Sequence, residues 1–294
     1  MSVRHPIIAV TGSSGAGTTT VMKSFAHIFR REHIKAQVIE GDSFHRFDRA
    51  EMRARVRAAD KGEAPPISHF GPESNLLEEL AGTLQSYGAT GNGKVRRYVH
   101  DDIEAKELGV EPGNFTDWKP MAEKSDVLFY EGLHGGYSAD GADVASNVDL
   151  LVGVVPIINL EWIQKLHRDK NVRGYSQDAV VDTILRRMPD YVKHICPQFS
   201  RTHVNFQRVP TVDTSNPFIA RDIPSADESM VIIRFANPKG IDFPYLQSML
   251  RGSWMSRANT IVVPGGKMEL AMQLIFTPFI WRMMERRQRA LGAL

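Results

Sequence analysis

Apolar residues near the start of the chain fall first in a continuous run, then at helical spacing, then in a second run. The first run, HPIIAVTG (5–12), stops at glycine, which is typical of a buried parallel strand. Residues 19–32 follow with helical spacing, and their large apolar side chains share one face: Val21, Phe25, Ile28 and Phe29. The second run, AQVIEGD (36–42), is typical of a second buried strand. This order predicts a βαβ unit, which implies a parallel sheet with a right-handed crossover.

Further apolar runs of strand length occur downstream, at SDVLFYEGLHGG (125–136) and VDLLVGVVP (148–156). The segment 88–120 is punctuated by glycine and proline. Helical spacing is found at four places: around 48–60, 73–87, 159–170 and 176–194. After residue 200, the runs THVNFQRVPTVD, SMVIIRFA and NTIVVPGG predict strands with few helices between them, and a final helix from about 267.

Together these elements predict an α/β fold with a mainly parallel sheet flanked by helices. About 1–200 would form a nucleotide-binding core. About 201–294 would add strands and a last helix to the same body, so that 1–294 is a single domain.

The composition narrows the class of protein. The chain has 294 residues, 42% of them hydrophobic and 24% charged, which indicates a soluble globular protein. Its net charge of +2 provides no basic field, so no nucleic-acid partner is expected. The single cysteine, Cys196, excludes an intrachain disulfide framework and fits a reducing compartment. The apolar segment 270–281 is interrupted by Pro278 and is shorter than the roughly 20 residues that span a bilayer. The start, MSVRHPIIAVTG, is unlike a secretory leader. We therefore expect a cytoplasmic protein without a membrane partner.

A glycine-rich loop joins the first strand to the first helix. Glycines let several backbone N–H groups converge on a phosphate at a helix N-terminus. The candidate ATP-binding residues are Gly12, Ser13, Ser14, Gly15, Ala16, Gly17, Thr18, Thr19 and Thr20. In the pattern G-x-x-x-x-G-K-[ST], Thr19 takes the hydroxyl position that ligates Mg²⁺, but Thr18 takes the lysine position. A strand–helix turn without a ligand and a dinucleotide loop are the alternatives, although the G-x-G-x-x-G spacing is absent.

Asp42 follows the second strand, where βαβ proteins build their sites. A carboxylate there can accept the proton of a hydroxyl that attacks phosphorus, or orient that hydroxyl; the alternative is a helix N-cap. His45 and Arg49 are four residues apart, would share a helical face beside Asp42, and could hold an anionic group. Arg53 and Arg57 continue the same spacing of four residues. The alternative interpretation of these arginines is a solvated basic helical face.

Glu131 ends the apolar run DVLFYEG. An acid in this position of a P-loop enzyme binds Mg²⁺ directly or through water. The alternative is a strand-end glutamate paired with a surface lysine. His134 and Tyr137 lie in the glycine-rich turn that follows and would face the same edge.

The segment EWIQKLHRDKNVRGYS is the candidate source of the missing positive charge. On a helix, Lys165, Arg168 and Asp169 can project together, and the alternative is a surface ion-pair ladder. The glycine after Arg173 suggests a hinge between two helices. Such a flap could bring Lys165, Arg168 and Arg173 over the phosphates and exclude water.

The segments GSSGAGTTT, EGDSFHR, LFYEGLHGG and KLHRDKNVRG together resemble the phosphoribulokinases of the bacterial type, which are related to uridine kinase in the P-loop superfamily. The resemblance covers most of the chain and implies a P-loop kinase-like core. It also implies Mg²⁺-ATP-dependent phosphorylation of D-ribulose 5-phosphate at O1. The product would be the bisphosphate that Rubisco carboxylates.

The mechanism expected for such an enzyme places ATP on residues 12–20, with Mg²⁺ held by Thr19 and Glu131. Asp42 would be the base, and Asp169 would be either the alternative base or a helper in metal binding. The residues expected at the sugar phosphate are His45, Arg49, Tyr98, His100 and His134. The cations expected at the transferring phosphoryl group are Lys165, Arg168 and Arg173, one of which would replace the lysine absent at Thr18.

The resemblance also implies regulation and assembly: activation by NADH, inhibition by AMP, and a large homo-oligomer such as an octamer. Plant-type members carry a redox cysteine where this chain has Ala16, so switching by an internal disulfide is not expected. Two alternatives stay open. One is a P-loop kinase of another small molecule, such as a nucleoside or pantothenate. The other is a non-catalytic nucleotide-binding regulator.

Overall fold

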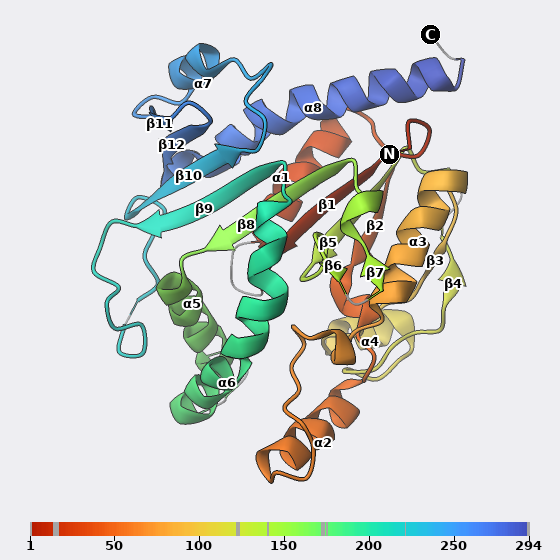
Figure 1. Cartoon of the computed structure of the whole chain (residues 1–294), viewed down its shortest axis with the longest axis vertical. Coiled ribbons are helices and arrows are strands. Elements are labelled where there is room, and N and C mark those ends of the chain that lie inside the picture. The colour runs from red at the N-terminus through yellow and green to blue at the C-terminus, as the bar shows by residue number, and fades with distance from the viewer. Residues whose placement is uncertain are drawn as a thin grey trace.

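The computed structural model describes residues 2–13, 18–121, 124–139, 141–171, 174, 176–220 and 222–292. The main sheet in this part of the chain has eight strands in the order β11-β12-β10-β9-β8-β1-β5-β2 (Figure 1). Its parallel part consists of β1 (Ile7–Gly12), β2 (Ala36–Glu40), β5 (Val127–Gly132), β8 (Leu150–Pro156) and β9 (Val204–Pro210). Its antiparallel extension consists of β10 (Ser229–Phe235), β11 (Trp254–Arg257) and β12 (Thr260–Pro264).

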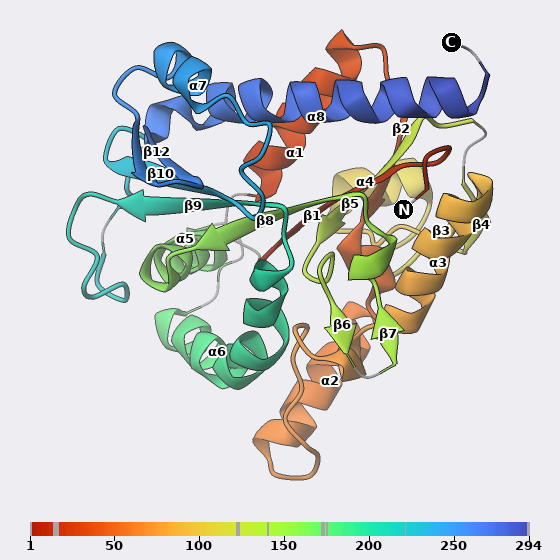
Figure 2. The same ribbon diagram turned by 45° about the horizontal axis from the view of Figure 1, so that its top comes forward.

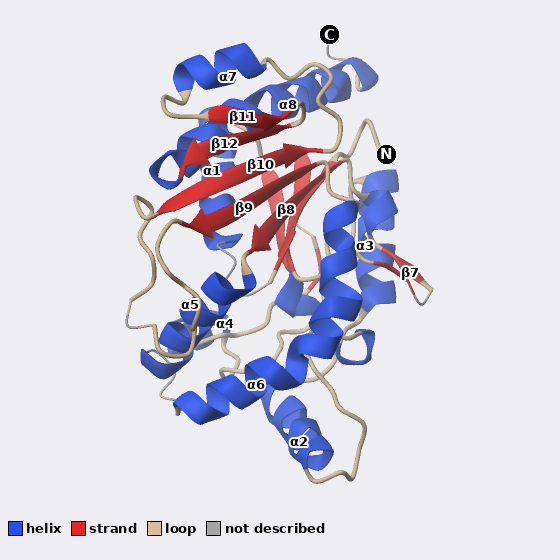
Figure 3. Ribbon diagram, turned by 60° about the vertical axis from the view of Figure 1, so that its left-hand side comes forward, coloured by secondary structure: helices blue, strands red, loops and turns tan. Residues whose placement is uncertain are grey.

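Helices cover both faces of this sheet. Helices α1 (Thr18–Arg31) and α8 (Met268–Ala290) lie on one face, and α3 (Leu77–Thr90) lies on the other (Figures 1 and 2). Helices α5 (Ile158–Asn171) and α6 (Gln177–Asp190) follow β8 at the end where its arrow points (Figure 3). The remaining helices are α2 (Arg49–Asp60), which projects from the body, α4 (Asp102–Leu108) and α7 (Phe243–Met249).

Short elements complete the chain. Two small antiparallel pairs are formed by β3 (Lys94–Val95) with β4 (Lys119–Pro120) and by β6 (Ser138–Ala139) with β7 (Ala142–Asp143). Single 3₁₀ turns occur at Gly41–Phe44, Pro72–Ser74, Ala145–Asn147, Cys196–Ser200 and Gly265–Lys267. A π-helical turn, Tyr191–Ile195, follows α6.

The core is divided by the sheet into two apolar layers, because the central strands are buried on both faces. In β1, Ile8 and Val10 face the layer under α1 and α8, whereas Ile7 and Ala9 face the layer under α3. Helix α1 is tied to α8 by apolar and polar contacts. The rings of Phe25 and Phe276 lie 4.7 Å apart, and Arg31 donates to the hydroxyl of Thr277 at 2.9 Å.

The predicted α/β fold with added C-terminal strands and a final helix is confirmed. The apolar face of residues 19–32 is buried as expected. The segment 270–281 lies within α8, with Met272 and Phe276 fully buried. None of the described helices is long and apolar enough to cross a membrane.

Four local expectations were wrong. The second strand, β2, is not a buried one, because it lies at the edge of the sheet and its Val38 is 46% exposed. His45 and Arg49 do not share a helix, because His45 is extended after the turn Gly41–Phe44 and α2 begins only at Arg49, capped by the Asp48 side chain. The helix expected from 73 begins at Leu77, because Pro72–Ser74 forms a 3₁₀ turn. The helix expected to reach 194 changes to a π turn after Asp190.

Candidate active site

The ends of β1, β2, β5 and β8 meet at one edge of the sheet, and most of the candidate residues follow them. Register places Glu131 of β5 opposite both Val10 and Glu40. Gly41 and Gly132 then approach so closely that a Cβ on Gly41 would lie 2.8 Å from the Cα of Gly132. Glycine at both positions therefore lets the chain carry Asp42 across the end of β5.

The glycine loop has the strand–loop–helix context that phosphate binding requires. Gly12 ends β1, Ser13 is buried, and the backbone of Thr18–Thr20 opens α1. Ser14, Gly15, Ala16 and Gly17 lie outside the described residues, as do the side chains of Thr18 and Thr19. Phosphate and Mg²⁺ contacts of this loop therefore stay predictions.

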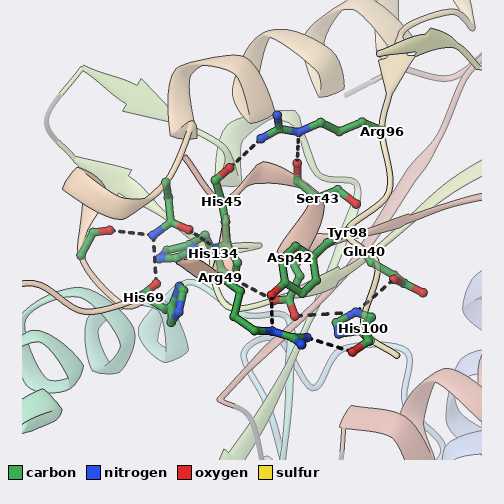
Figure 4. A network of polar contacts seen from close by, with 12 residues as sticks. Glu40, Asp42, Ser43, His45, Arg49, His69, Arg96, Tyr98, His100 and His134 are labelled. Carbon is green, nitrogen blue, oxygen red and sulfur yellow. Dashed lines mark hydrogen bonds and ion pairs between the residues drawn. The ribbon is translucent and has the colours of Figure 1, made fainter. Parts of the chain in front are cut away.

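Asp42 and His45 form a close ion pair (Figure 4). Nε2 of His45 lies 3.1 Å from Oδ1 of Asp42, and His100 Nε2 is 3.9 Å from Oδ2. The His45 side chain is only 9% exposed, but that of Asp42 is 43% exposed and so reachable by a substrate. Burial alone would raise the pKa of Asp42. The hydrogen bond and charge of His45 outweigh this effect, with smaller contributions from the charges of His100 and His69, and hold the pKa of Asp42 well below its usual range. Burial lowers the pKa of His45, but Asp42 outweighs this and raises it above 6.5.

Arg49, Tyr98 and His100 lie beside this pair (Figure 4). Arg49 Nε donates to the Tyr98 hydroxyl at 3.2 Å, and its terminal nitrogen donates to the carbonyl of His100 at 2.8 Å. The Tyr98 and His100 rings meet edge to face, 5.0 Å apart. Gly113 permits this packing, because a Cβ there would lie 2.8 Å from Arg49 Cβ. A guanidinium and an imidazole near a carboxylate suit a substrate that carries both a phosphate group and a reacting hydroxyl.

His134 is placed differently from these residues. It is buried, and its Nε2 lies 3.0 Å from the carbonyl oxygen of Phe70. Burial lowers the pKa of His134 to about 4, so its ring is neutral. The described contacts of His134 are with the protein interior, and its contact with a substrate stays a prediction.

Arg96 is a site residue that sequence reasoning missed. Its guanidinium donates to the carbonyls of Ser43 at 2.8 Å and His45 at 2.6 Å, on either side of the turn that carries Asp42 (Figure 4). The same group lies 3.8 Å above the Phe115 ring and 4.8 Å above that of Trp118. It therefore fixes the backbone between Asp42 and His45. The only sequence signal was its position in RRYVHDD, two residues before Tyr98.

Replacing Arg96 with glutamine is expected to lower kcat/KM for the acceptor about 10- to 100-fold, because the turn that carries Asp42 loses both anchors. The free energy of unfolding should fall by about 2 kcal/mol. Steady-state kinetics and urea unfolding measure the two effects. Arg97→Gln is the matched control, since Arg97 is exposed; equal effects of both substitutions would contradict an anchoring role.

Helix α5 carries the second group of candidate residues. Lys165 Nζ lies 2.6 Å from Asp169 Oδ2, and Arg168 Nε lies 3.1 Å from Asp169 Oδ1. Asp169 is buried, which by itself would raise its pKa. Its two cationic neighbours outweigh this effect and lower the pKa of Asp169. Gly174, at φ 70°, separates α5 from α6, as the hinge prediction requires. Arg173 lies outside the described residues.

Arg187 of α6 interacts electrostatically both with the residues around Asp42 and with those of α5. Its positive charge lowers the pKa of both His45 and Lys165, so it lies within reach of each. It was missed because nothing in the sequence of α6 distinguishes it from the adjacent Arg186. The cationic side chains near the candidate site therefore come from α2, α5 and α6.

Glu161, at the start of α5, is a buried acid that sequence reasoning left without a role. Burial raises its pKa from 4.5 to about 7, although the hydroxyls of Ser13 and Tyr191 and the charges of Lys165 and Arg168 oppose this. Because the folded protein holds the acid in its protonated form, stability should fall as pH rises from about 4.5 through about 7.

The Glu161→Gln variant should therefore be more stable than the wild type above pH 7, by about 3 kcal/mol at most. The two proteins should converge near pH 4.5. Urea unfolding at a series of pH values measures the difference. A difference in the free energy of unfolding that stayed constant across this pH range would show that the pKa of Glu161 is the same in the folded and unfolded states.

The donor set at this edge fits Mg²⁺. The described residues contain no group of three or more acidic, histidine or cysteine side chains that could hold a metal ion. Mg²⁺ in kinases needs no such group, since it keeps several waters and takes one or two carboxylates together with substrate phosphates. Glu131, partly exposed at the end of β5, is the matching carboxylate.

Comparison with known proteins agrees with this geometry. The family described as Phosphoribulokinase / Uridine kinase matches residues 7–215. The chain is 67% identical over 290 residues to the chromosomal phosphoribulokinase of Cupriavidus necator, covering 99% of each chain. It is 64% identical over 288 residues to the phosphoribulokinase of Nitrobacter vulgaris, covering 98% of this chain and 99% of the relative.

Among solved structures, the chain resembles phosphoribulokinase from Rhodobacter spheroides. The TM-score is 0.90 at 57% sequence identity, covering 98% of this chain and 100% of that one. The fold and the polar edge of the sheet define a small-molecule kinase. The chain belongs to the phosphoribulokinase/uridine kinase family, and the resemblance noted from its motifs is confirmed. Membership of this kinase family implies ATP and Mg²⁺ as co-substrate and metal.

Proposed function

We infer that the protein transfers the γ-phosphoryl group of ATP to O1 of D-ribulose 5-phosphate, giving ribulose 1,5-bisphosphate and ADP. The observation that carries this inference is the 67% identity over almost the full length to a relative named phosphoribulokinase. The site supports it, because an exposed carboxylate stands beside cations suited to a phosphorylated acceptor.

Asp42 orients the sugar hydroxyl and accepts its proton. Because its pKa is held low, it is a weak base, and proton transfer comes late, as the oxygen bonds to phosphorus. Such timing suits a loose transition state in which positioning and charge matter most. Arg49, Tyr98 and His100 contact the phosphate that the sugar already carries, and His45 attracts it through its positive charge.

Lys165 and Arg168 neutralise charge on the transferring phosphoryl group, together with Arg173. Thr19 and Glu131 would hold Mg²⁺, which neutralises charge on the β- and γ-phosphates when bound. Residues 12–20 cradle the phosphates through backbone N–H groups. Closure of α5 and α6 about Gly174 excludes water from the transfer.

The family resemblance also supports activation by NADH, inhibition by AMP and assembly into a homo-oligomer such as an octamer. We propose these properties together with a cytoplasmic location and with 1–294 as a single domain. Sedimentation analysis with and without NADH measures the assembly.

The function is tested by ADP release with Mg²⁺-ATP and a panel of acceptors, each with and without NADH. The panel is ribulose 5-phosphate, its isomers ribose 5-phosphate and xylulose 5-phosphate, uridine and pantothenate. Turnover confined to ribulose 5-phosphate is expected. Turnover of uridine or pantothenate would identify another small-molecule kinase, and binding of ATP without turnover of any acceptor would identify a non-catalytic protein.

A further inference from the structure

Asn75 is a buried amide whose orientation is fixed by its surroundings. Its Nδ2 donates to two backbone carbonyls, those of His69 at 2.9 Å and Gly71 at 2.6 Å. Carbonyls only accept, so both N–H groups of the amide face them, and Oδ1 is left to accept. That oxygen lies 2.8 Å from Nδ1 of His45. Nδ1 of His45 must therefore carry a proton.

The other ring nitrogen of His45 also faces an atom that only accepts. Nε2 lies 3.1 Å from Oδ1 of Asp42, whose side chain is 43% exposed and is therefore ionised at neutral pH like an ordinary aspartate. A hydrogen bond there requires a proton on Nε2. With an acceptor on each side, His45 is complementary to the imidazolium form rather than to either neutral tautomer.

The backbone holds this arrangement in register. His45 and Asn75 pair across an isolated antiparallel bridge. On either side of it, Arg46 N donates to the carbonyl of Ser74 at 2.8 Å, and Leu76 N donates to that of Phe44 at 2.7 Å. The distance between the imidazole and the amide is thus set by main-chain hydrogen bonds rather than by flexible side chains.

We propose that Asn75 is a positioning residue that holds His45 as an imidazolium, so that a fixed positive charge stands beside the carboxylate of Asp42. This charge keeps Asp42 ionised and attracts the phosphate of an anionic acceptor. The identification of that acceptor rests on the proposed function; the protonation state of His45 does not.

The other groups around His45 were weighed against this assignment. They come from several elements: Asp42 after β2, His69 before α3, Tyr98 before α4, His134 after β5 and Arg187 of α6. The His69 ring packs against His45 with centroids 4.4 Å apart, and burial and the His45 charge lower its pKa far enough to keep it neutral. His134 is neutral for the same reason. Burial and the charge of Arg187 oppose the positive charge on His45, whereas Asp42 and Asn75 favour it and outweigh them, so the pKa of His45 is raised.

Neutron diffraction from crystals of the deuterated wild-type chain at about neutral pH tests the protonation state directly. Deuterium is expected on both Nδ1 and Nε2 of His45, with the ND₂ group of Asn75 facing the two carbonyls. Deuterium on only one nitrogen of His45 would overturn the proposal. This experiment needs no variant, so it decides the question even where a substitution prevents folding.

Two substitutions then test whether Asn75 acts through its oxygen. Asn75→Leu removes the acceptor, and the KM for the sugar phosphate should rise about tenfold at pH 7.5. In the pH profile of kcat/KM, the pH at which activity falls on the alkaline side (the alkaline limb) should decrease by about one unit, and the KM for ATP should not change. Asn75→Asp keeps an acceptor for His45 but sets a second oxygen against the carbonyls of His69 and Gly71. It should lower Tm while leaving the alkaline limb at or above its wild-type position.

The matched control is Asn259→Leu, which removes an amide that donates to the carbonyl of Phe235 at 2.8 Å in the hairpin of β11 and β12. It should lower Tm without moving the pH profile. Equal movement of the alkaline limb in Asn75→Leu and Asn75→Asp would overturn the proposal, because lost packing would then be the cause. Turnover of the wild type on ribulose 5-phosphate tests the proposed function separately, so failure of one inference can be told from failure of the other.

Discussion

Replacing Asp42 with asparagine should lower kcat about 10²- to 10⁴-fold, the range in which a positioned base contributes. Asparagine keeps the size of the side chain and can still orient a hydroxyl, but it cannot take the proton. The loop 12–20 is untouched, so the KM for ATP should change little. Stopped-time ADP assays at saturating ribulose 5-phosphate measure kcat, and nucleotide titration measures ATP binding.

Two comparisons make this result specific. Asp117→Asn changes an exposed carboxylate and should leave kcat unaltered. Asp169→Asn removes the alternative base. Should Asp42→Asn retain near-normal kcat while Asp169→Asn loses it, the base would be Asp169, and Asp42 would be assigned to substrate orientation.

Replacing Lys165 with glutamine should lower kcat about 10²- to 10³-fold, as loss of one charge-stabilising group at a transition state does. The same change leaves the buried carboxylate of Asp169 with Arg168 as its remaining partner on α5 among the contacts described above, so Tm should fall as well. Kinetic constants are therefore corrected for the folded fraction, measured by circular dichroism. Lys170→Gln, five residues further along α5 at an exposed position, is the matched control.

A double substitution tests whether Lys165 replaces the lysine absent from the glycine loop. Thr18→Lys restores the usual residue at that position of the motif. Combined with Lys165→Gln, it should recover kcat at least tenfold over Lys165→Gln alone. If kcat did not recover, Lys165 would not replace the lysine of the loop, and the loop would bind phosphate through its backbone N–H groups alone.

The parts of the fold that were predictable are those whose burial is continuous or strictly periodic. Strands β1, β5 and β8 are buried on both faces, so each is an unbroken apolar run. Strand β11 was missed because it is a short edge strand whose Trp254 is 45% exposed. Helix α7 was missed because its seven residues are too few to show a period.

The candidate site was predictable where a residue directly follows a strand. Asp42 could be placed because the carboxyl ends of parallel strands meet at one edge. Arg96 and Asn75 could not, since their partners are 51 and 30 residues away and they act through backbone carbonyls and a ring nitrogen. The prediction that His45 and Arg49 share a helical face was wrong, because their spacing of four residues suggested a helix where the chain makes a turn.

The contact between α1 and α8 has a consequence for how the protein is made. Arg31 and Thr277, which bond to each other, are 246 residues apart. At roughly 5 to 20 residues per second, a ribosome takes roughly 12 to 50 s to make the chain between them. During that time Phe25, on the helix that follows the glycine loop, lacks the contact that Phe276 provides. The nascent chain therefore leaves the ring of Phe25 without this contact until the last helix has been synthesised.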